Sequence, residues 1–452
     1  MTVSEETGLK ESEIGRIPKD WDTISFDKAI SHIVDNRGKT APTSKNGIAL
    51  IATNCIKENA LYPVKERIRY VSKETYENWF RDHPKPDDII IVNKGTPGMV
   101  CLVPSPVDFV IAQDMVAVRP NKSRIYGRFL FAFMRSKIFK HEVDSLNVGT
   151  TIPHLKKTYF PLLTVPLPSK DEQTAIGDTY YNLSKKIETN LKMNETLEAI
   201  GHAVFNRWFV DFEFPNEGGK PYKSSGGEMI DSEIGEIPKR WLISSLDQLH
   251  EKKENCVITG PFGSNLHASD YRETGTPLIL VKHVKDGRIS GGDMPSVGNH
   301  KFPEMNRYLL KIGDIVFTRV AVVGESAYIR KRNENWMISG QMLRVRANRN
   351  RINPRYLAQV FQQRIFKDQV SNYAVGSTRP SLNTKLLLSF KFVLPPLRLQ
   401  NNFSELLEGA DAQIENNLNQ IDTLSSIRDL LLPKLMSGKI RVPVPKDNVE
   451  PD

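Results

Sequence analysis

Apolar side chains recur at alternating intervals of about three and four residues over Gln173–Phe209. They fall at positions 176, 180, 183, 187, 197, 204 and 208, and no proline interrupts the stretch. This spacing is typical of a helix that carries the narrow apolar seam of a coiled coil. Because one helix cannot bury such a seam alone, the pattern predicts a long helix with a partner helix.

The same pattern returns once, over Gln400–Met436, and a shift of 227 residues places the first stretch on the second, with Ile187 on Ile414. A long helix present in two copies indicates a duplicated module. The second copy is the obvious partner of the first. Because each copy follows a globular segment, we predict an antiparallel pair with pseudo-two-fold symmetry.

Two asparagines, Asn190 and Asn417, fall on the predicted seam at matching positions. A polar seam residue costs stability but can define the register of a coiled coil. The alternative is that local curvature turns both side chains to solvent. The pattern alone leaves the two possibilities open.

The segments that precede the helices, residues 22–165 and 242–392, predict mixed domains. Short β-rich runs such as 88–92 alternate with turn signals and with a helical pattern over 127–143. Matching pieces recur in both segments: NGIALI and TGTPLI, DDIIIV and GDIVFT, VGTTIPHL and VGSTRPSL. The residues between these pieces differ. Two domains with similar frameworks but different intervening residues are expected to bind two different ligands of one class.

The predicted fold class is therefore α+β, with two mixed globular domains in a pseudo-two-fold repeat and two long helices that form an antiparallel coiled coil. The expected divisions are 1–165 for the first globular domain with its lead-in 11–21, 166–214 for the central helix, 215–241 for a flexible linker and a second lead-in, 242–392 for the second globular domain, 393–441 for the C-terminal helix, and 442–452 for a flexible tail. The two lead-ins, ESEIGRIPKDW and DSEIGEIPKRW, are best explained as packing segments.

Positive charge is concentrated in the globular segments. Residues 22–165 contain 21 Lys and Arg against 14 Asp and Glu, and residues 242–392 contain 23 against 12, although the whole chain carries a net charge of only +9. A basic globular unit that occurs twice is the electrostatic signature of a polyanion binder. Simple solvation of a surface is the alternative, but the repetition favours nucleic acid.

Composition limits the cellular setting. The sequence has no run of about 18 apolar residues, so we expect no membrane span. The polar, acidic start MTVSEETGLKESEIG does not resemble a signal peptide. The three cysteines, Cys55, Cys101 and Cys256, lie far apart and suit a reducing cytoplasm better than a disulfide framework.

No catalytic centre is visible in the sequence. GKT at 38–40 lacks the upstream glycine of a phosphate-binding loop, since Ile33 stands there. The nine histidines are dispersed, and no paired Cys-x-x-Cys offers a metal site. Glu251-Lys252-Lys253 matches a nuclease fragment but lacks a preceding acidic partner. We expect a binding protein that is not an enzyme and holds no metal.

The chain resembles the specificity subunits of type I restriction–modification systems. The residues that carry the resemblance are the SEIGxIPKxW lead-ins, the GIALI/GTPLI, GDIVFT and VGTTIPHL/VGSTRPSL pieces, LPSKDEQTAI before the first helix, WFVDFEFPNEGGKPYKSSGGEM after it, and the closing LLLPKLMSGKI. The likeness runs over nearly the whole chain in the family's order.

The resemblance implies two target recognition domains, each reading one half of a split, asymmetric DNA sequence. It also implies that the helices act as a spacer and dock two methyltransferase subunits, with restriction subunits, which translocate and cut DNA, as further partners. S-adenosylmethionine, ATP and Mg²⁺ are then expected on the partners and not on this chain. The target sequence does not transfer, because the recognition domains are the variable part of the family.

Candidate DNA contacts are polar loop residues of the globular segments: Arg37, Lys39, Lys45, Lys94 and Thr96 in the first, and Ser264, Asn265, Lys282, Arg319 and Arg379 in the second. Lysine and arginine suit phosphates, and arginine or asparagine can read base edges. Exposure to solvent without contact is the alternative for each. Thr151 and Thr378 are expected to be structural caps. The alternative functions are a coiled-coil adaptor with RNA- or protein-binding domains, and a self-contained nuclease.

Overall fold

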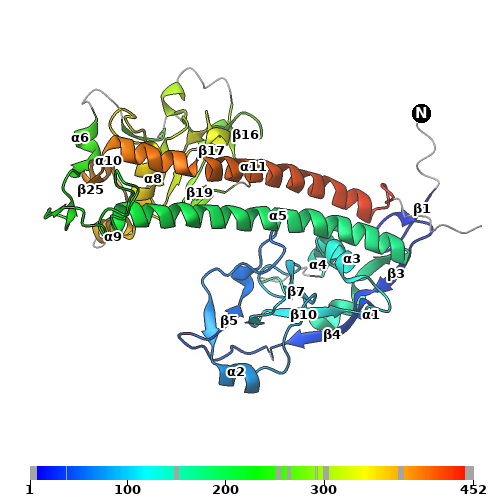
Figure 1. Ribbon diagram of the computed structural model, residues 1–452. Helices are drawn as coiled ribbons and strands as arrows, with labels where there is room; N and C mark the ends of the chain where they lie inside the picture. Colours follow the sequence, from blue (N-terminus) through cyan, green and yellow to red (C-terminus); the bar gives the residue numbers. More distant parts are fainter. Residues whose placement is uncertain are drawn as a thin grey trace, which may run out of the picture. The chain divides into compact units, whose positions relative to one another are not determined.

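The computed structural model describes residues 8–36, 38–146, 152–250, 256–261, 266–290, 292, 294–298, 305–374 and 381–442. The chain divides into two compact units (Figure 1). The first unit comprises residues 1–192 and 418–452, and the second comprises residues 193–417. Each unit therefore contains part of the long helix α5 (Lys170–Phe205) and part of the long helix α11 (Leu397–Met436).

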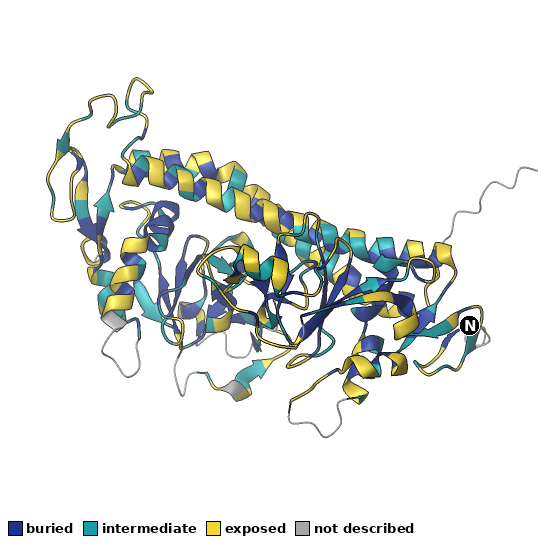
Figure 2. Ribbon diagram, turned by 90° about the horizontal axis from the view of Figure 1, so that it is seen from below, coloured by how far each residue is buried: buried dark blue, intermediate teal, exposed yellow. Residues whose placement is uncertain are grey.

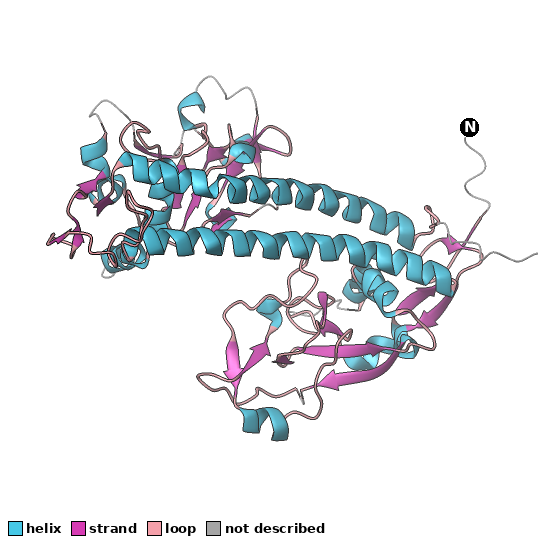
Figure 3. Cartoon of the chain, viewed as in Figure 1, coloured by secondary structure: helices cyan, strands magenta, loops and turns pink. Residues whose placement is uncertain are grey.

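The globular part of the first unit is a mixed domain whose central sheet has the order β4-β10-β7-β8, beside a smaller sheet β6-β5-β9 (Figure 3). Strand β11 pairs with β3, which follows the first lead-in. The elements are β1 (Leu9–Lys10), β2 (Ile17–Pro18), β3 (Asp22–Ser25), α1 (Phe26–Ala29), β4 (Ile30–Asp35), β5 (Ile48–Ile51), η1 (Thr53–Cys55), β6 (Arg69–Val71), α2 (Lys73–Asn78), β7 (Ile89–Val92), β8 (Val100–Leu102), β9 (Phe109–Ile111), β10 (Met115–Pro120), α3 (Gly127–Met134), α4 (Lys137–Ser145), η2 (Lys157–Leu162) and β11 (Thr164–Leu167).

The second unit repeats the topology of the central sheet, as β15-β24-β21-β22, and its smaller sheet β16-β20-β17-β23 has one strand more than that of the first unit. Its elements are η3 (Asn206–Val210), β12 (Met229–Ile230), β13 (Ile237–Pro238), β14 (Leu242–Ser245), α6 (Leu246–Leu249), β15 (Val257–Thr259), η5 (Ala268–Asp270), β16 (Tyr271–Arg272), β17 (Thr276–Ile279), η6 (Val281–His283), β18 (Val284–Lys285), β19 (Arg288–Ile289), β20 (Ser296–Val297), η8 (Asn306–Tyr308), β21 (Ile315–Thr318), β22 (Ser326–Tyr328), η9 (Lys331–Asn333), β23 (Met337–Ile338), β24 (Met342–Val345), α8 (Pro354–Gln362), α9 (Arg364–Ala374), α10 (Thr384–Ser389) and β25 (Lys391–Leu394). Together the units confirm the predicted α+β class.

The two long helices pair along an apolar seam, as the spacing predicts. In the first unit, Ile176 and Tyr180 of α5 share a core with Leu432 and Leu435 of α11. Residues near the start of α5 therefore pack against residues near the end of α11, so the two helices are antiparallel. Figure 2 shows the buried stripe of each helix and its exposed opposite face.

In the second unit the same antiparallel pairing joins the end of α5 to the start of α11. Phe205 packs edge-to-face on Phe403, with ring centroids 5.8 Å apart, and Leu407 joins the same core. Most of the stability of such helices comes from this packing and not from helix propensity. Each helix segment thus depends on the unit that surrounds it.

The seam asparagines are buried, which decides between the two possibilities left open by the sequence. Asn190 has 0% of its surface exposed and Asn417 has 2%. In the first unit Asn190 Nδ2 donates to Gln420 Oε1 at 3.1 Å, and in the second Asn417 Nδ2 donates to Asn194 Oδ1 at 2.8 Å. Each unit therefore has one amide hydrogen bond across the helix pair.

The shared framework extends to individual hydrogen bonds. At the start of α5, Gln173 Oε1 accepts the backbone N–H of Tyr126 at 2.8 Å, and at the start of α11, Gln400 Oε1 accepts that of Asn353 at 2.9 Å. Both glutamines also donate from Nε2 to a proline carbonyl five residues earlier. The residues that form these bonds in the two units are related by the same shift of 227 residues as the sequence repeat.

A buried carboxylate holds one arginine in the central sheet of each unit. Asp88 accepts two hydrogen bonds from Arg119, at 2.8 and 2.9 Å, and Asp314 accepts two from Arg346, both at 2.7 Å. In the smaller sheet of the first unit, the backbone at Gly47 comes close to a neighbouring strand, and Gly47 has a φ of +133°. A Cβ atom there would lie 2.3 Å from the Val71 carbonyl oxygen, so the turn requires glycine.

Two sequence expectations about local structure are wrong. The helical pattern over 127–143 is two helices, because the Ser136 side chain accepts the N–H of Phe139 and caps the start of α4. The linker after α5 is not flexible in the described structure. Phe214 stacks between Tyr222 and Trp241, with centroids 4.6 and 5.0 Å away, so this segment is part of the second core.

Candidate nucleic-acid interface

Loops gather at one end of the central sheet in the first unit. Strands β4 and β7 end where β10 begins, since Asp35 pairs with Val116 and Val92 pairs with Met115. The loop after β4 and the loop 93–99 after β7 therefore leave the sheet at the same end. Lys39 in the first loop, and Lys94 and Thr96 in the second, are exposed there.

Residues 152–155, the described part of the VGTTIPHL segment, lie at this end of the sheet. The N–H of Leu155 donates to the Asn93 carbonyl at 2.8 Å, and the N–H of Gly95 donates to the Pro153 carbonyl at 3.2 Å. Two stretches that lie about 60 residues apart in the sequence thus form one surface. It is a loop surface on a rigid sheet, which is a common arrangement for binding residues.

The second unit presents the same surface with other side chains. The N–H of Arg319 donates to the Gln341 carbonyl at 3.0 Å, and the Arg319 carbonyl accepts the N–H of Leu382 at 2.9 Å. Asn93 makes the matching bonds, to Asp114 and Leu155, in the first unit. Arg319 therefore stands at the position that Asn93 occupies on the first surface.

The structure separates the remaining described candidates from this end of the sheet. Lys45 follows Ser44, which bridges to Tyr70 on β6, and so belongs to the smaller sheet of the first unit. Lys282 lies in η6, directly after β17, and belongs to the smaller sheet of the second. Both side chains are exposed. Arg37, Ser264, Asn265 and Arg379, together with Thr151, Thr378 and Glu251-Lys252-Lys253, lie outside the described residues.

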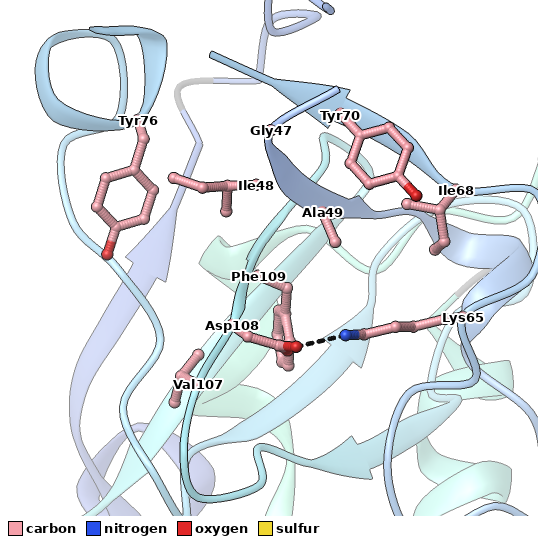
Figure 4. Close-up of a pocket in the computed structure, with 10 residues that line it drawn as sticks. All are labelled: Gly47, Ile48, Ala49, Lys65, Ile68, Tyr70, Tyr76, Val107, Asp108 and Phe109. Carbon is pink, nitrogen blue, oxygen red and sulfur yellow. Dashed lines mark hydrogen bonds and ion pairs between the residues drawn. The ribbon is translucent and has the colours of Figure 1, made fainter. Parts of the chain in front are cut away.

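The smaller sheet of the first unit carries a hollow of about 770 Å³ that sequence reasoning missed (Figure 4). Tyr70 of β6 and Tyr76 of α2 lie on either side of it, and Lys65 forms an ion pair of 2.5 Å with Asp108 at its edge. A weak signal was available, because the period of a strand places Ile68 and Tyr70 on one face. Stacking of bases on aromatic rings requires unpaired bases, and Lys65 is already paired with Asp108, so this hollow is not assigned to contact with duplex DNA.

Several arginines of the basic segments serve the framework instead of a ligand. Arg119 and Arg346 are held by Asp88 and Asp314 in the sheets. Burial, with the charge of Arg346 nearby, lowers the pKa of Arg344 to about 10. The positive charge that remains for a ligand is therefore carried mainly by exposed lysines and by loop arginines.

Within the described ranges, no group of three or more His, Cys, Asp or Glu side chains is arranged to hold a metal ion. The described helices include none that is long and apolar enough to cross a membrane. The site is thus a pair of matching loop surfaces on basic, duplicated domains. A protein of this kind is a two-domain nucleic-acid recognition protein.

Comparison with known proteins shows the family to which the chain belongs. The family model for the type I restriction modification DNA specificity domain matches twice, over residues 20–199 and 232–424. The chain therefore belongs to the type I restriction–modification DNA specificity family, and recognition of the DNA target is its role.

Curated relatives are similar over most of the chain or nearly all of it. The type I restriction enzyme MjaIX specificity subunit of Methanocaldococcus jannaschii is 27% identical over 97% of each chain. The EcoKI specificity subunit of Escherichia coli K12 is 20% identical over 78% of this chain and 75% of its own. The crystal structure of the type I S subunit from M. genitalium superposes with a TM-score of 0.52, at 15% identity, over 92% of this chain and 96% of that one. These likenesses confirm the predicted family and fold.

Proposed function

We propose that each unit reads one half of a split, asymmetric DNA target. The support is the repeated loop surface with different side chains. Asn93 and Arg319 make matching backbone bonds in the two units but offer different chemistry. Asn93 is buried, so on the first surface the neighbouring exposed Lys94 and Thr96 would face the DNA, whereas on the second Arg319 could bond guanine. One framework thus suits two different half-sites.

Affinity and specificity would come from different residues. The exposed Lys39, Lys45, Lys94 and Lys282 would neutralise phosphates, which would make binding strong and dependent on salt. Thr96 and the variable loop residues would contact base edges, because phosphate contacts carry no direct sequence information.

Membership of this family also supports a more detailed proposal about the role of the chain within a complex. We propose that this chain has no active site, and that two methyltransferase subunits dock on the helices α5 and α11. Restriction subunits would join that assembly. S-adenosylmethionine, ATP and Mg²⁺ would be held by those partners, and the complex would work in the cytoplasm. The helices would also define the spacing between the half-sites.

Methylome sequencing of a host that carries this system tests the proposal. Arg319→Ala should relax the methylated motif at one half-site only, while Lys94→Ala should lower methylation of all sites without changing the motif. Lys311→Ala is the matched control, because Lys311 is exposed near the opposite end of strand β21.

Two outcomes would contradict the proposal. One is an unchanged motif in every variant. The other is a wild-type chain that binds RNA as well as duplex DNA and recruits no methyltransferase, which would favour an adaptor protein.

A further inference from the structure

Each unit has a buried tryptophan where its lead-in meets the start of a long helix. In the first unit Trp21 is 1% exposed, and its Nε1 donates to Glu172 Oε2 at 3.2 Å. Arg441 then binds Glu172 Oε1 at 2.6 Å and reaches Asp20 at 2.6 and 3.1 Å. The indole, the two carboxylates and the guanidinium form a closed cluster, in which every polar group has a partner.

The second unit lacks both carboxylates at the matching positions, and one of them is replaced by a cation. The 227-residue register that aligns Gln173 with Gln400 places Leu399 where the first unit has Glu172. The aligned lead-ins place Arg240 where the first unit has Asp20. No carboxylate of the first cluster is therefore retained in the second unit.

The second unit nevertheless retains the tryptophan ring and its buried environment. Trp241 is 3% exposed, and Phe214, which corresponds to Arg441 in the register, stacks on it at 5.0 Å with an interplanar angle of 29°. In the described part of the chain, Trp241 Nε1 donates no hydrogen bond. The ring lines a hollow, where its N–H can bond water or a polar group of a ligand.

A hollow of about 1000 Å³ lies at this place. Trp241 lines it together with Lys220, Arg240 and Arg398. None of these three cations forms an ion pair within 4 Å among the described residues. Two carboxylates also line the hollow. Glu228 is bound by Lys239 at 2.5 Å, and Glu217 is exposed and forms no ion pair within the described part of the chain.

We propose that this hollow receives an aspartate or glutamate side chain from an acidic segment of a partner protein, which takes the place that Glu172 fills in the first unit. Arginines bind carboxylates through strong, charge-assisted hydrogen bonds, and the indole N–H supplies a third donor. The inference rests on the proposed assembly with methyltransferase subunits and names one contact within it.

A DNA phosphate suits the cations less well than a carboxylate does at this position. The hollow is lined by the segment after α5, the second lead-in and the start of α11, and none of its residues belongs to the loops that end the central sheet. The first unit also shows the chemistry that satisfies this indole, which is a carboxylate.

Charge reversal of the full-length chain tests the proposal. Arg240→Glu with Arg398→Glu should weaken binding of the system's methyltransferase subunit at least tenfold in a purified titration, with a smaller loss at high salt. Arg240→Lys with Arg398→Lys should retain most of the affinity. Lys311→Glu with Arg364→Glu is the matched control for net charge, since both side chains are exposed in the second unit.

The tryptophans supply a paired control for the hydrogen bond. Trp241→Phe removes the donor together with part of a buried ring system, so it should lower the melting temperature through lost packing. It should in addition weaken methyltransferase binding several-fold. Trp21→Phe should lower the melting temperature without changing that affinity, because it breaks a bond inside the first unit.

The outcomes separate this inference from the proposed function. Methyltransferase affinity within twofold of wild type in the Glu variants would overturn the inference and leave DNA recognition intact. Loss of DNA binding by the Glu variants without the partner would also overturn it, and would indicate a phosphate site. A wild-type chain that binds DNA but no methyltransferase would refute the proposed assembly, and the inference with it.

Discussion

Buried asparagines give the helix pair chemical specificity at the level of single residues. Asn190 and Asn417 lie in an apolar seam, yet each bonds an amide of the opposite helix within its own unit. A sliding of one helix past the other would bury these amides without partners, at a cost of about 1–3 kcal/mol each. The asparagines therefore favour one register over others that an all-apolar seam would permit.

The asparagines of the seam allow a test that separates the contribution of hydrogen bonding to stability from that of burial. Asn417→Leu should lower the melting temperature, because Asn194 loses its partner and costs about 1–3 kcal/mol. Replacing both Asn194 and Asn417 by Leu should recover most of that loss, since two apolar side chains can pack together. Thermal denaturation followed by circular dichroism measures both. A double variant less stable than Asn417→Leu would argue against the pairing.

Glu142 predicts a pH dependence of stability. Burial raises the pKa of its carboxyl from 4.5 to about 7; the N–H of Thr164 opposes this shift, and Glu13 adds to it. The folded protein therefore holds a proton that the unfolded chain releases between pH 4.5 and 7. Stability contributed by the neutral form is present below pH 4.5 and is lost as the pH rises through 7.

Glu142→Gln removes this titration while keeping an oxygen that can accept the N–H of Thr164. The variant should melt at a higher temperature than wild type at pH 8, with the difference disappearing near pH 4. Melting curves across this range provide the measurement. An equal difference at both ends of the range would show that packing, and not protonation, is responsible.

At the scale of elements, the sequence pattern predicts the existence of the long helices well and the boundaries of the helices less well. Helices α5 and α11 begin three residues before the apolar repeat, because Gln173 and Gln400 anchor the first turns to neighbouring segments. The split between α3 and α4 depends on Ser136, whose capping role competes with a continuous helical pattern. Local signals thus specify which elements form, and specific side-chain bonds decide where they end.

One carboxylate attaches the second recognition domain to its helix. Asp411 of α11 binds Arg330 at 2.7 Å and Arg355 at 2.9 Å, and both guanidiniums are largely buried. Asp411→Asn should lower the free energy of unfolding by roughly 3 kcal/mol, because Arg355 loses its counter-charge and Arg330 keeps only Glu198, 4.0 Å away. Denaturant unfolding measures the loss. Glu408→Gln, an exposed change on the same helix, should be neutral, and equal effects would contradict the assignment.

At the scale of the whole molecule, duplication turns one binding surface into two. The family match repeats in both halves, and the described frameworks share hydrogen bonds, glycine turns and buried ion pairs. Helix α5 contributes residues to both units. Its length is therefore expected to influence the distance between the two half-sites on DNA.

An insertion tests this role of the helix. Four residues added near Asn190 lengthen α5 by about 6 Å, at 1.5 Å per residue. We expect the methylated motif to keep both half-sites while their spacing changes, which methylome sequencing would show. Unchanged spacing in a variant that still methylates DNA would mean that the helix does not act as a ruler.

The primary structure alone was sufficient for the long helices, the duplication, the basic domains and the family. These properties depend on local periodicity, composition and internal similarity, which need no knowledge of contacts. The burial of Asn190, the packing of Phe214, the hollow beside Tyr70, and the contrast between the Trp21 and Trp241 sites depend on residues that are distant in sequence. Only folding brings such residues together, and so only the tertiary structure could decide them.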